Sequence, residues 1–422
     1  MNILIKSALI IDPNSPHNKK KRDILIEQGV ITSIKSEIKA DKGIKVVESE
    51  NLCVSPGWFD LQANFADPGF EYKEDLNSGT KAAAQGGFTG VCLMPSTHPP
   101  LSTKSDIEYV KNKTAGNIVD IYPAGCVSHN AEGKELSEMY DMHLSGAIAF
   151  TDDKKAVNNS GLLLRALLYS KNFNGIVLTY CDDKGISADG KMNEGTTSTA
   201  LGIKGMPALA EELMVSRNIQ IAEYAGARIH IASVSTKGSV ELIREAKAKK
   251  LKVTASVNAY NIALDDSLLN GFDPNYKVNP PLRTVEDIQA LKKGIADGTI
   301  DVITSDHSPE DIESKKTEFD HAAFGMSSIE AAFALVNSNK ERLKLEKIIS
   351  ALAINPRKIL GIEIPSIKEN SRANITLFDP EKQWTVESSK LRSKSKNNPF
   401  AGQKFIGKVI GVYNKKAYVA AT

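Results

Sequence analysis

The stretch "ARIHIASVSTKGSVELIREAKAKKLKVTASVNAY", residues 227–260, decides the fold class. It begins with a short apolar run typical of a buried strand and continues with apolar residues at helical spacing. A second strand-like run ends it. Two strands joined through a helix are typical of a βαβ unit, in which the strands lie parallel. The stretch therefore predicts an α/β protein with a parallel sheet.

The same alternation continues on both sides of this unit, between Gly57 and Gly361. Further strand-like runs, each separated from the next by a helical window, are "GVCLMPS", "DIYPAGCVS", "GAIAFTDD", "GIVLTYCDD" and "DVITSDHS". About eight such units close into a (β/α)₈ barrel. We therefore predict a barrel over residues 56–364.

The two ends of the chain have a different pattern. Residues 1–55 alternate in strand fashion, as in "DILIEQGVITSI", and residues 365–422 return to it in "ANITLFDP" and "KFIGKVIGVYNKKAYVA". Turn residues such as Asp, Gly and Pro end these runs. We predict that residues 1–55 and 365–422 form one composite β-sandwich domain, with the barrel inserted between its halves.

Composition excludes several classes of function. The 53 basic and 51 acidic residues give a net charge of +2, which creates no overall field for nucleic acid or a membrane surface. The four cysteines are widely spaced, without a CxxC pair, as suits a reducing compartment. The first apolar run, "MNILIKSALIID", is too short and too interrupted by charge for a signal peptide. We expect a cytoplasmic protein that binds neither nucleic acid nor membrane.

Polar residues at the strand ends are the candidates for chemistry, because barrel active sites lie at the carboxyl ends of the strands. Gln62 and Asn64 follow the run "GWFDL", Asp153 ends "AFTDD", and Asp306 follows "DVITS". The chain has only seven histidines. No three of them can be brought together at the strand ends without breaking the barrel register.

Several longer motifs resemble dihydroorotase, of the longer class related to allantoinase and dihydropyrimidinase. They are "DPGFEYKEDLNSGTKAAAQGGFTGVCLMPSTHPP", "MNEGTTSTALGIKGMPALAEE", "YKVNPPLR", "DGTIDVITSDHSP" and "NNPFAGQKFIGKV". The resemblance spans nearly the whole chain. It implies an amidohydrolase barrel that opens the cyclic amide of dihydroorotate in pyrimidine synthesis. One or two zinc ions would lower the pKa of a bound water to about 7 for that reaction.

The resemblance also implies which positions bind the metal, and most of them have changed. The six family ligand positions are occupied here by Gln62, Asn64, Asp153, Tyr180, Ser233 and Asp306. Asp153 and Asp306 keep the family carboxylates, whereas the other four positions are histidine in the family. Zinc usually takes three protein ligands in catalytic sites. We therefore expect no bound metal and no other cofactor.

The resemblance places four substrate contacts as well. Ala66 stands where the family has the arginine that grips the substrate carboxylate, Ser96 replaces an asparagine, and Glu310 replaces a histidine. Only Asn279 keeps the family residue. Asp306 is at the general-base position. It has either kept a chemical role or is present to cap nearby backbone N–H groups.

Three functions remain open on the sequence. The first is a non-catalytic dihydroorotase homologue with a structural or regulatory role. Its partner would be aspartate carbamoyltransferase, another dihydroorotase chain or a second copy in a homodimer. The second is an active cyclic amidohydrolase with a remodelled site, whose metal would be held by Asp153, Asp306 and a replacement ligand such as His98 or His129. The third is a metal-free pocket for a small ligand.

Overall fold

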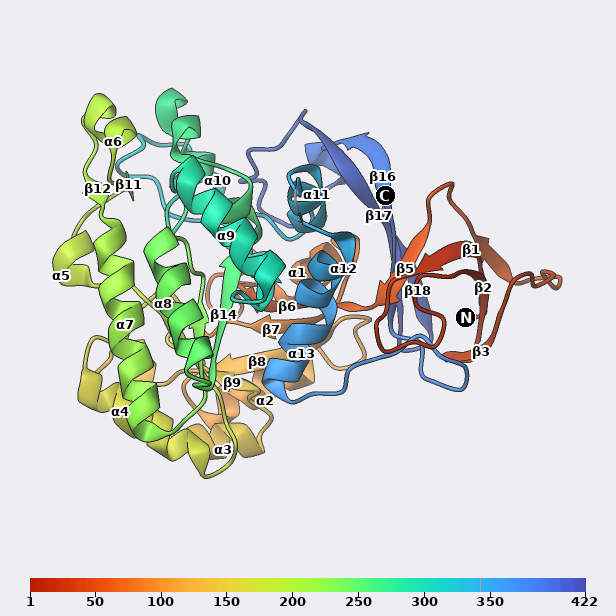
Figure 1. The fold of residues 1–422 in the computed structure, drawn as a ribbon, viewed down its shortest axis with the longest axis horizontal. Coiled ribbons are helices and arrows are strands. Elements are labelled where there is room, and N and C mark those ends of the chain that lie inside the picture. The colour runs from red at the N-terminus through yellow and green to blue at the C-terminus, as the bar shows by residue number, and fades with distance from the viewer. Residues whose placement is uncertain (342) are drawn as a thin grey trace.

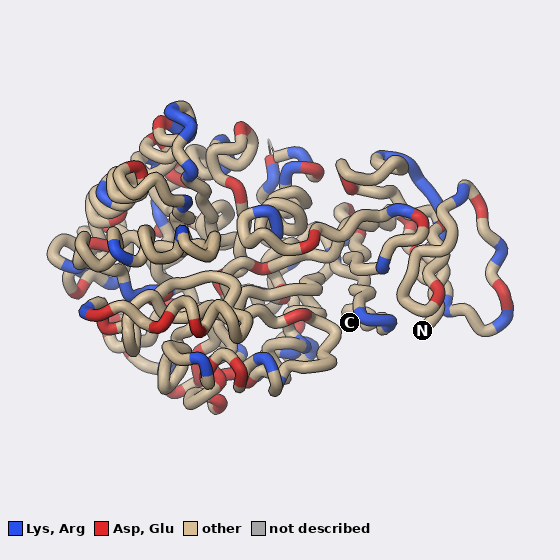
Figure 2. Tube along the Cα trace, turned by 90° about the horizontal axis from the view of Figure 1, so that it is seen from below, with Lys and Arg blue, Asp and Glu red and all other residues tan. Residues whose placement is uncertain are grey.

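The computed structural model describes residues 1–341 and 343–422. A barrel surrounded by helices forms one part of the molecule, and a β-rich part that carries the N-terminus adjoins it (Figure 1). Basic and acidic residues are interspersed along the trace of both parts (Figure 2). Among the described helices, none is long and apolar enough to cross a membrane.

Eight parallel strands form the barrel. In spatial order they are β6 (Trp58–Ala63), β7 (Phe88–Leu93), β8 (Asp120–Gly125), β9 (Ala149–Phe150), β10 (Val177–Tyr180), β13 (Ile229–Ala232), β14 (Val253–Asn258) and β15 (Val302–Thr304). The ring closes where Ala63 pairs in parallel with His307, and the Asn64 amide donates to the His307 carbonyl at 2.8 Å. The predicted (β/α)₈ barrel is confirmed.

Helices cover the outside of the barrel. The principal ones are α1 (Leu76–Gln85), α2 (Lys104–Lys113), α4 (Ser160–Lys171), α7 (Ala208–Ala225), α8 (Lys237–Ala248), α9 (Val285–Asp297), α11 (Ala332–Ser338) and α13 (Asn355–Leu360). Shorter elements are α3 (Met139–Leu144), α5 (Lys184–Ser187), α6 (Thr196–Leu201), α10 (Ile312–Lys315), α12 (Leu345–Ile349), β11 (Met192–Asn193) and β12 (Gly205–Met206).

The stretch 227–260 forms β13, α8 and β14, as predicted. Thr236 caps α8, because its hydroxyl accepts the Ser239 amide at 3.1 Å and so satisfies one free N–H of the first turn. Val240, Ile243 and Ala246 recur at helical spacing and are buried. Local signals alone therefore account for this unit.

The β-rich part is one hydrogen-bonded sheet built from both ends of the chain. Its strands, in spatial order, are β18 (Ala417–Ala420), β17 (Lys404–Asn414), β16 (Ile375–Thr385), β5 (Cys53–Pro56), β1 (Ile3–Ile10), β2 (Lys21–Glu27) and β3 (Val30–Lys35), with β4 (Lys45–Val47) beside β1. The antiparallel pairing of β5 with β16 joins the N-terminal strands to the C-terminal ones. The exact domain limits, 1–55 with 365–422 against 56–364, stay a prediction.

Aromatic packing joins the barrel to this sheet. Trp58, at the start of β6, is fully buried. Its ring centroid lies 4.7 Å from that of Phe333 on α11 and 5.4 Å from that of Phe378 on β16. Its indole N–H donates to the Ser55 hydroxyl at 3.0 Å. The first barrel strand is thereby held against both the helical layer and the sheet.

Candidate functional site

The mouth of the barrel is shaped by four residues in the left-handed backbone conformation. Ala66, Asp153, Ser233 and Asp306 have φ values of 56°, 50°, 57° and 49°. Each follows a barrel strand, and each is a family site position. Such a conformation costs a residue other than glycine about 1–3 kcal/mol and is concentrated at functional sites. The strand ends at these four positions therefore share a strained backbone conformation.

Asp306 is the centre of a buried hydrogen-bond network. Its Oδ1 accepts the Gln62 Nε2 amide at 2.9 Å, and its Oδ2 accepts the Asn258 Nδ2 amide at 3.1 Å. The Tyr260 hydroxyl also donates to Oδ2. Asp306 itself is 5% exposed. Of the two alternatives left open for Asp306, backbone capping does not match the structure, because the donors placed on its carboxylate are side chains.

Lys154 supplies the fourth donor, and sequence reasoning missed it. Its ammonium lies 2.9 Å from Asp306 Oδ2 and 3.4 Å from the Ser233 hydroxyl. It also lies over the Tyr180 ring, 5.1 Å from the centroid. The signal was the run "FTDDKK", in which a lysine directly follows Asp153. Buried carboxylates need a nearby positive charge when no metal is present.

Two family ligand positions are bonded to each other. The Ser233 hydroxyl donates to Gln62 Oε1 at 3.0 Å, while the Gln62 amide donates to Asp306. Gln62 and Ser233 are both buried. The polar groups that replace histidines in this part of the mouth therefore satisfy one another.

Asp153 and Asn64 belong to a second, smaller cluster. Asp153 Oδ2 accepts the Ser96 hydroxyl at 2.6 Å, whereas its Oδ1 has no hydrogen-bond partner among the described residues. Burial raises the pKa of Asp153. Asn64 Oδ1 accepts the Ala66 amide at 2.7 Å, and its Nδ2 donates to the Ser96 carbonyl at 3.2 Å. Asn64 therefore stabilises the turn after β6 instead of reaching Asp306.

The family substrate positions do not converge on one point. Asn279 Oδ1 accepts the Tyr180 hydroxyl at 2.6 Å. Burial holds the pKa of Tyr180 well above its ordinary value, so the phenol stays protonated and donates. Glu310 pairs with Lys73 at 2.7 Å and lines a separate hollow of about 900 Å³. Ala66 has no side-chain group that could hold a carboxylate.

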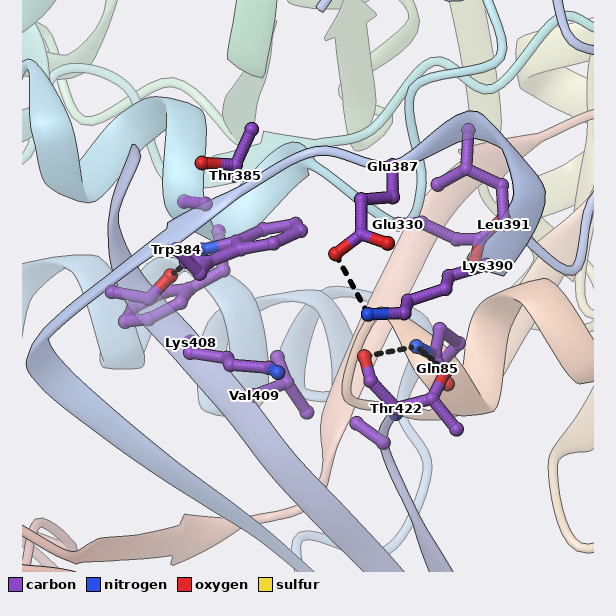
Figure 3. Close-up of a pocket in the computed structure, with 14 residues that line it drawn as sticks. Gln85, Glu330, Trp384, Thr385, Glu387, Lys390, Leu391, Lys408, Val409 and Thr422 are labelled. Atoms are coloured by element: carbon purple, nitrogen blue, oxygen red, sulfur yellow. Dashed lines mark hydrogen bonds and ion pairs between the residues drawn. The ribbon is translucent and has the colours of Figure 1, made fainter. Parts of the chain in front are cut away.

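Another cavity, of about 290 Å³, lies where the C-terminal strands meet α1 and α11 (Figure 3). Trp384 and Gln85 line it, and an ion pair of 2.7 Å between Lys390 and Glu387 crosses its rim. Of the described residues that line it, none is a family site position. The cavity is therefore distinct from the barrel mouth.

Comparison with known proteins decides the family. A family model described as dihydro-orotase-like matches residues 52–239. The dihydroorotase of Thermoanaerobacter sp. (strain X514) is 41% identical over 413 residues, which cover 97% of this chain and 95% of that protein. The dihydroorotase of Geobacter sp. (strain M21) is 40% identical over 413 residues, 97% of each chain. This chain belongs to the dihydroorotase family.

Solved structures of a hydantoinase and a dihydropyrimidinase share the fold of this dihydroorotase-family chain. The L-hydantoinase (dihydropyrimidinase) from Arthrobacter aurescens superposes with a TM-score of 0.85 at 22% identity, covering 99% of this chain and 96% of that chain. The dihydropyrimidinase from Brevibacillus agri NCHU1002 gives a TM-score of 0.81 at 22% identity, covering 100% and 95%. These two likenesses concern the fold alone.

The residues at the mouth do not fit the zinc of active dihydroorotases. Within residues 1–341 and 343–422, no group of three or more His, Cys, Asp or Glu side chains is placed to hold a metal. Zinc binds thiolates, imidazoles and carboxylates. Four of the six family ligand positions instead carry an amide, a hydroxyl or a phenol. The Lys154 ammonium also lies directly on the Asp306 carboxylate.

The histidines supply no replacement ligand at the mouth of this dihydroorotase-family barrel. His98 and His129 are exposed. His307 is buried 3.5 Å from Glu74, and its Nδ1 accepts the Ser328 amide at 3.2 Å. His230 is buried within β13, where its Nδ1 lies 2.9 Å from the Thr254 hydroxyl. None of these contacts joins the Asp306 network.

The buried His230 should make stability depend on pH. Burial lowers the pKa of His230 from 6.5 to about 3. The unfolded chain therefore binds the extra proton first, and stability falls as the pH drops below about 6.5. The loss approaches ~1.4 kcal/mol for each pH unit. Urea unfolding between neutral and mildly acidic pH gives the free energy of unfolding at each pH. That free energy should fall less steeply with falling pH for His230→Gln than for the exposed control His98→Gln. Equal slopes would contradict the assignment.

Proposed function

We propose that this protein is a non-catalytic, cytoplasmic member of the dihydroorotase family with a structural or regulatory role in pyrimidine biosynthesis. The observation that carries the proposal is the hydrogen bonding of Asp306. Its carboxylate accepts hydrogen bonds from Gln62, Lys154, Asn258 and Tyr260. Asp306 stands at the family position of a metal ligand and general base. Its acceptor sites are taken by other side chains of the same protein.

Physical chemistry supports a loss of hydrolysis. A carboxylate has about four lone-pair sites, and a general base needs one of them directed at the proton that it removes. The four donors on Asp306 compete for those sites. The Lys154 ammonium is one of these donors and lies 2.9 Å from Oδ2. Ala66 offers no positive charge to orient an anionic substrate.

The scaffold supports a retained role as a binding partner. The packing of the barrel and the joining of the two chain ends are intact, although the catalytic groups are replaced. On α7, Leu209, Leu213 and Tyr224 are 51%, 47% and 82% exposed. Leu209 and Leu213 are four residues apart on this helix, so their exposed side chains are neighbours. Contiguous exposed apolar surface is a feature of protein–protein contacts. We propose aspartate carbamoyltransferase as the partner, with another dihydroorotase chain or a second copy as the alternatives.

Activity and metal content test the first half of the proposal. Protein purified without added metal should contain far less than one zinc per chain and should not hydrolyse dihydroorotate above background. The Thermoanaerobacter relative, assayed in parallel, serves as the positive control. Stoichiometric zinc, with a hydrolysis that Asp306→Ala abolishes, would instead establish the alternative of an active cyclic amidohydrolase with a remodelled site.

Co-purification tests the second half. The native protein, recovered from its own cells, should bring aspartate carbamoyltransferase with it. Leu213→Glu on α7 should weaken that association at least tenfold. Val285→Glu, at a position of α9 that is 59% exposed, is the matched control and should leave it unchanged. Recovery of the wild type only as a lone homo-oligomer would contradict the partnership.

A further inference from the structure

A cavity of about 670 Å³ lies at the end of the barrel opposite the mouth, between the barrel and the β-rich sheet. Its barrel wall includes Phe59 near the start of β6 and Asp120 at the first position of β8, and its sheet wall includes Val30 of β3. Barrel active sites are built at the carboxyl ends of the strands, so this cavity is not part of one. Cavities between two packed parts of a protein are common sites for small ligands.

Arg357 of α13 lines this cavity and has free hydrogen-bond donors. It is 3% exposed. Its Nη1 donates to the carbonyls of Gly57 and Ala353, and its Nη2 donates to the Thr89 hydroxyl at 3.2 Å. A guanidinium has five N–H groups, so Nε and one N–H of Nη2 have no acceptor among the described residues. The existing bonds fix the group in place, which favours binding because less motion is lost.

The charge of Arg357 also lacks a counter-ion. In the part of the chain that the structure describes, no ion pair joins it to a carboxylate. Asp120, on the same cavity, is paired with Lys415 at 2.7 Å instead, and Glu363 is exposed to solvent. Burial lowers the pKa of Arg357 to about 10, so the group is still charged at neutral pH. Buried charges in proteins are usually paired, and a bound anion would supply the missing partner.

The rest of the cavity lining is basic as well. Asp120 and Glu363 are its two acidic residues, whereas its five basic residues are Arg357, Lys368, Arg372, Lys415 and Lys416. An excess of positive charge around a hollow attracts anions, and it suits a ligand with more than one negative charge. Phosphate and carboxylate groups both accept two N–H groups from one guanidinium.

We propose that this cavity binds a small metabolite that carries phosphate or carboxylate groups. Arg357 donates to an oxyanion of the ligand, and the surrounding basic side chains add a positive field. The cavity volume falls within the range of ordinary small-molecule pockets and leaves room for more than a single inorganic ion. Because its walls come from the barrel and from the sheet, the bound ligand also links these two parts of the molecule.

Calorimetric titration of the full-length protein tests the proposal. The probes are sodium pyrophosphate and sodium citrate, each at an ionic strength held constant with sodium chloride. We expect saturable binding of at least one probe at one site per chain, with a rise in Tm, because a ligand of the folded state stabilises it. The probe that binds more tightly assigns the ligand to the phosphate or the carboxylate class.

Variants of two arginines locate the binding. Arg357→Lys keeps the charge but lacks the paired donors, so it should weaken binding by roughly tenfold or more. Arg372→Glu, at an exposed position of the lining, should weaken it by roughly fivefold or more without lowering the Tm of the free protein. Arg165→Glu makes the same charge change at an exposed position of α4 outside the cavity and should leave binding unchanged.

The Arg372→Glu and Arg165→Glu measurements decide the matter if Arg357→Lys does not fold. Failure of both probes to bind saturably, an effect that sodium chloride alone reproduces, or equal weakening by these two variants would overturn the proposal. The test is independent of the proposed function, because the cavity and the barrel mouth lie at opposite ends of the strands. Zinc-dependent hydrolysis by the wild type would overturn the proposed function and leave this site unaffected.

Discussion

Replacing Glu74 with alanine is expected to lower the free energy of unfolding by ~3 kcal/mol or more, because each buried donor left without its acceptor costs ~1–3 kcal/mol. Glu74 is fully buried, and its carboxylate accepts the hydroxyls of Ser78 and Ser393. It also accepts the Lys394 amide at 3.1 Å and lies 3.5 Å from His307 Nε2. Alanine would deprive the buried Ser393 hydroxyl and the buried His307 Nε2 of this acceptor.

Glu74 also holds Ser393 and Lys394, which lie in the segment after β16, against the barrel. Urea unfolding followed by circular dichroism would measure the loss. The neighbouring exposed residue gives a matched control, and Glu71→Ala should change the free energy by less than about 1 kcal/mol. Glu74→Gln keeps one acceptor oxygen. Its loss of unfolding free energy should lie between those of Glu71→Ala and Glu74→Ala. A value for Glu74→Ala within error of the Glu71→Ala value would contradict the assignment.

The Glu74 interaction should also weaken in acid. Burial alone would raise the pKa of Glu74, but its hydrogen bond and charge interaction with His307 and its bond with Ser393 lower it overall. A carboxylate whose folded pKa lies below the ordinary 4.5 adds stability at pH values above 4.5. That contribution is lost as the pH falls through the folded pKa. The difference between wild type and Glu74→Ala should therefore shrink in strongly acidic solution.

Trp58→Ala is the second substitution with a large expected effect, a loss of ~3–5 kcal/mol. The indole packs between Phe333 of α11 and Phe378 of β16, so its removal leaves a cavity where barrel and sheet meet. The Ser55 hydroxyl would also lose the indole N–H, which it accepts at 3.0 Å. We expect a lower midpoint of urea unfolding. We also expect the barrel and the sheet to unfold at different urea concentrations, because the contact that couples them is lost.

The chain contains only two tryptophans, which makes the control direct. Trp384 lies partly exposed on β16, with its N–H on the Gly407 carbonyl at 2.9 Å. Trp384→Ala should cost less than half as much as Trp58→Ala, because a surface cavity is filled by water. Circular dichroism follows both variants. A single cooperative transition at the wild-type midpoint for Trp58→Ala would refute the role given to this contact.

Much of the barrel could be predicted from the sequence because its signals are local. In residues 227–260 the change from strand period to helical period falls where β13, α8 and β14 begin and end. The strand character of both chain ends was equally visible. The sequence also predicted that the barrel closes and that the two ends join. It did not predict which strands and residues make these contacts, β5 with β16 and Ala63 with His307, because these partners lie far apart in the chain.

For the candidate site, too, some features could be predicted from the sequence and others could not. Residue identities at single positions, read through the family resemblance, predicted the replaced histidines at Gln62, Tyr180 and Ser233. They did not predict the donors that surround Asp306. Lys154 follows β9 and Tyr260 follows β14, so nothing local in either segment indicates a shared partner. The choice between the two roles left open for Asp306 could not be made from the sequence for the same reason, because its side-chain donors come from other strands.

By itself, the sequence determined which chemical groups this barrel possesses and the order of its strands and helices, because periodicity and residue type are properties of neighbouring positions. Only the tertiary structure decided what those groups do to one another. Ring closure brings side chains from three other strand ends to the Asp306 carboxylate. Hydrogen bonds act over about 3 Å regardless of separation along the chain. The contact between Lys154 and Asp306 therefore exists only in the folded barrel.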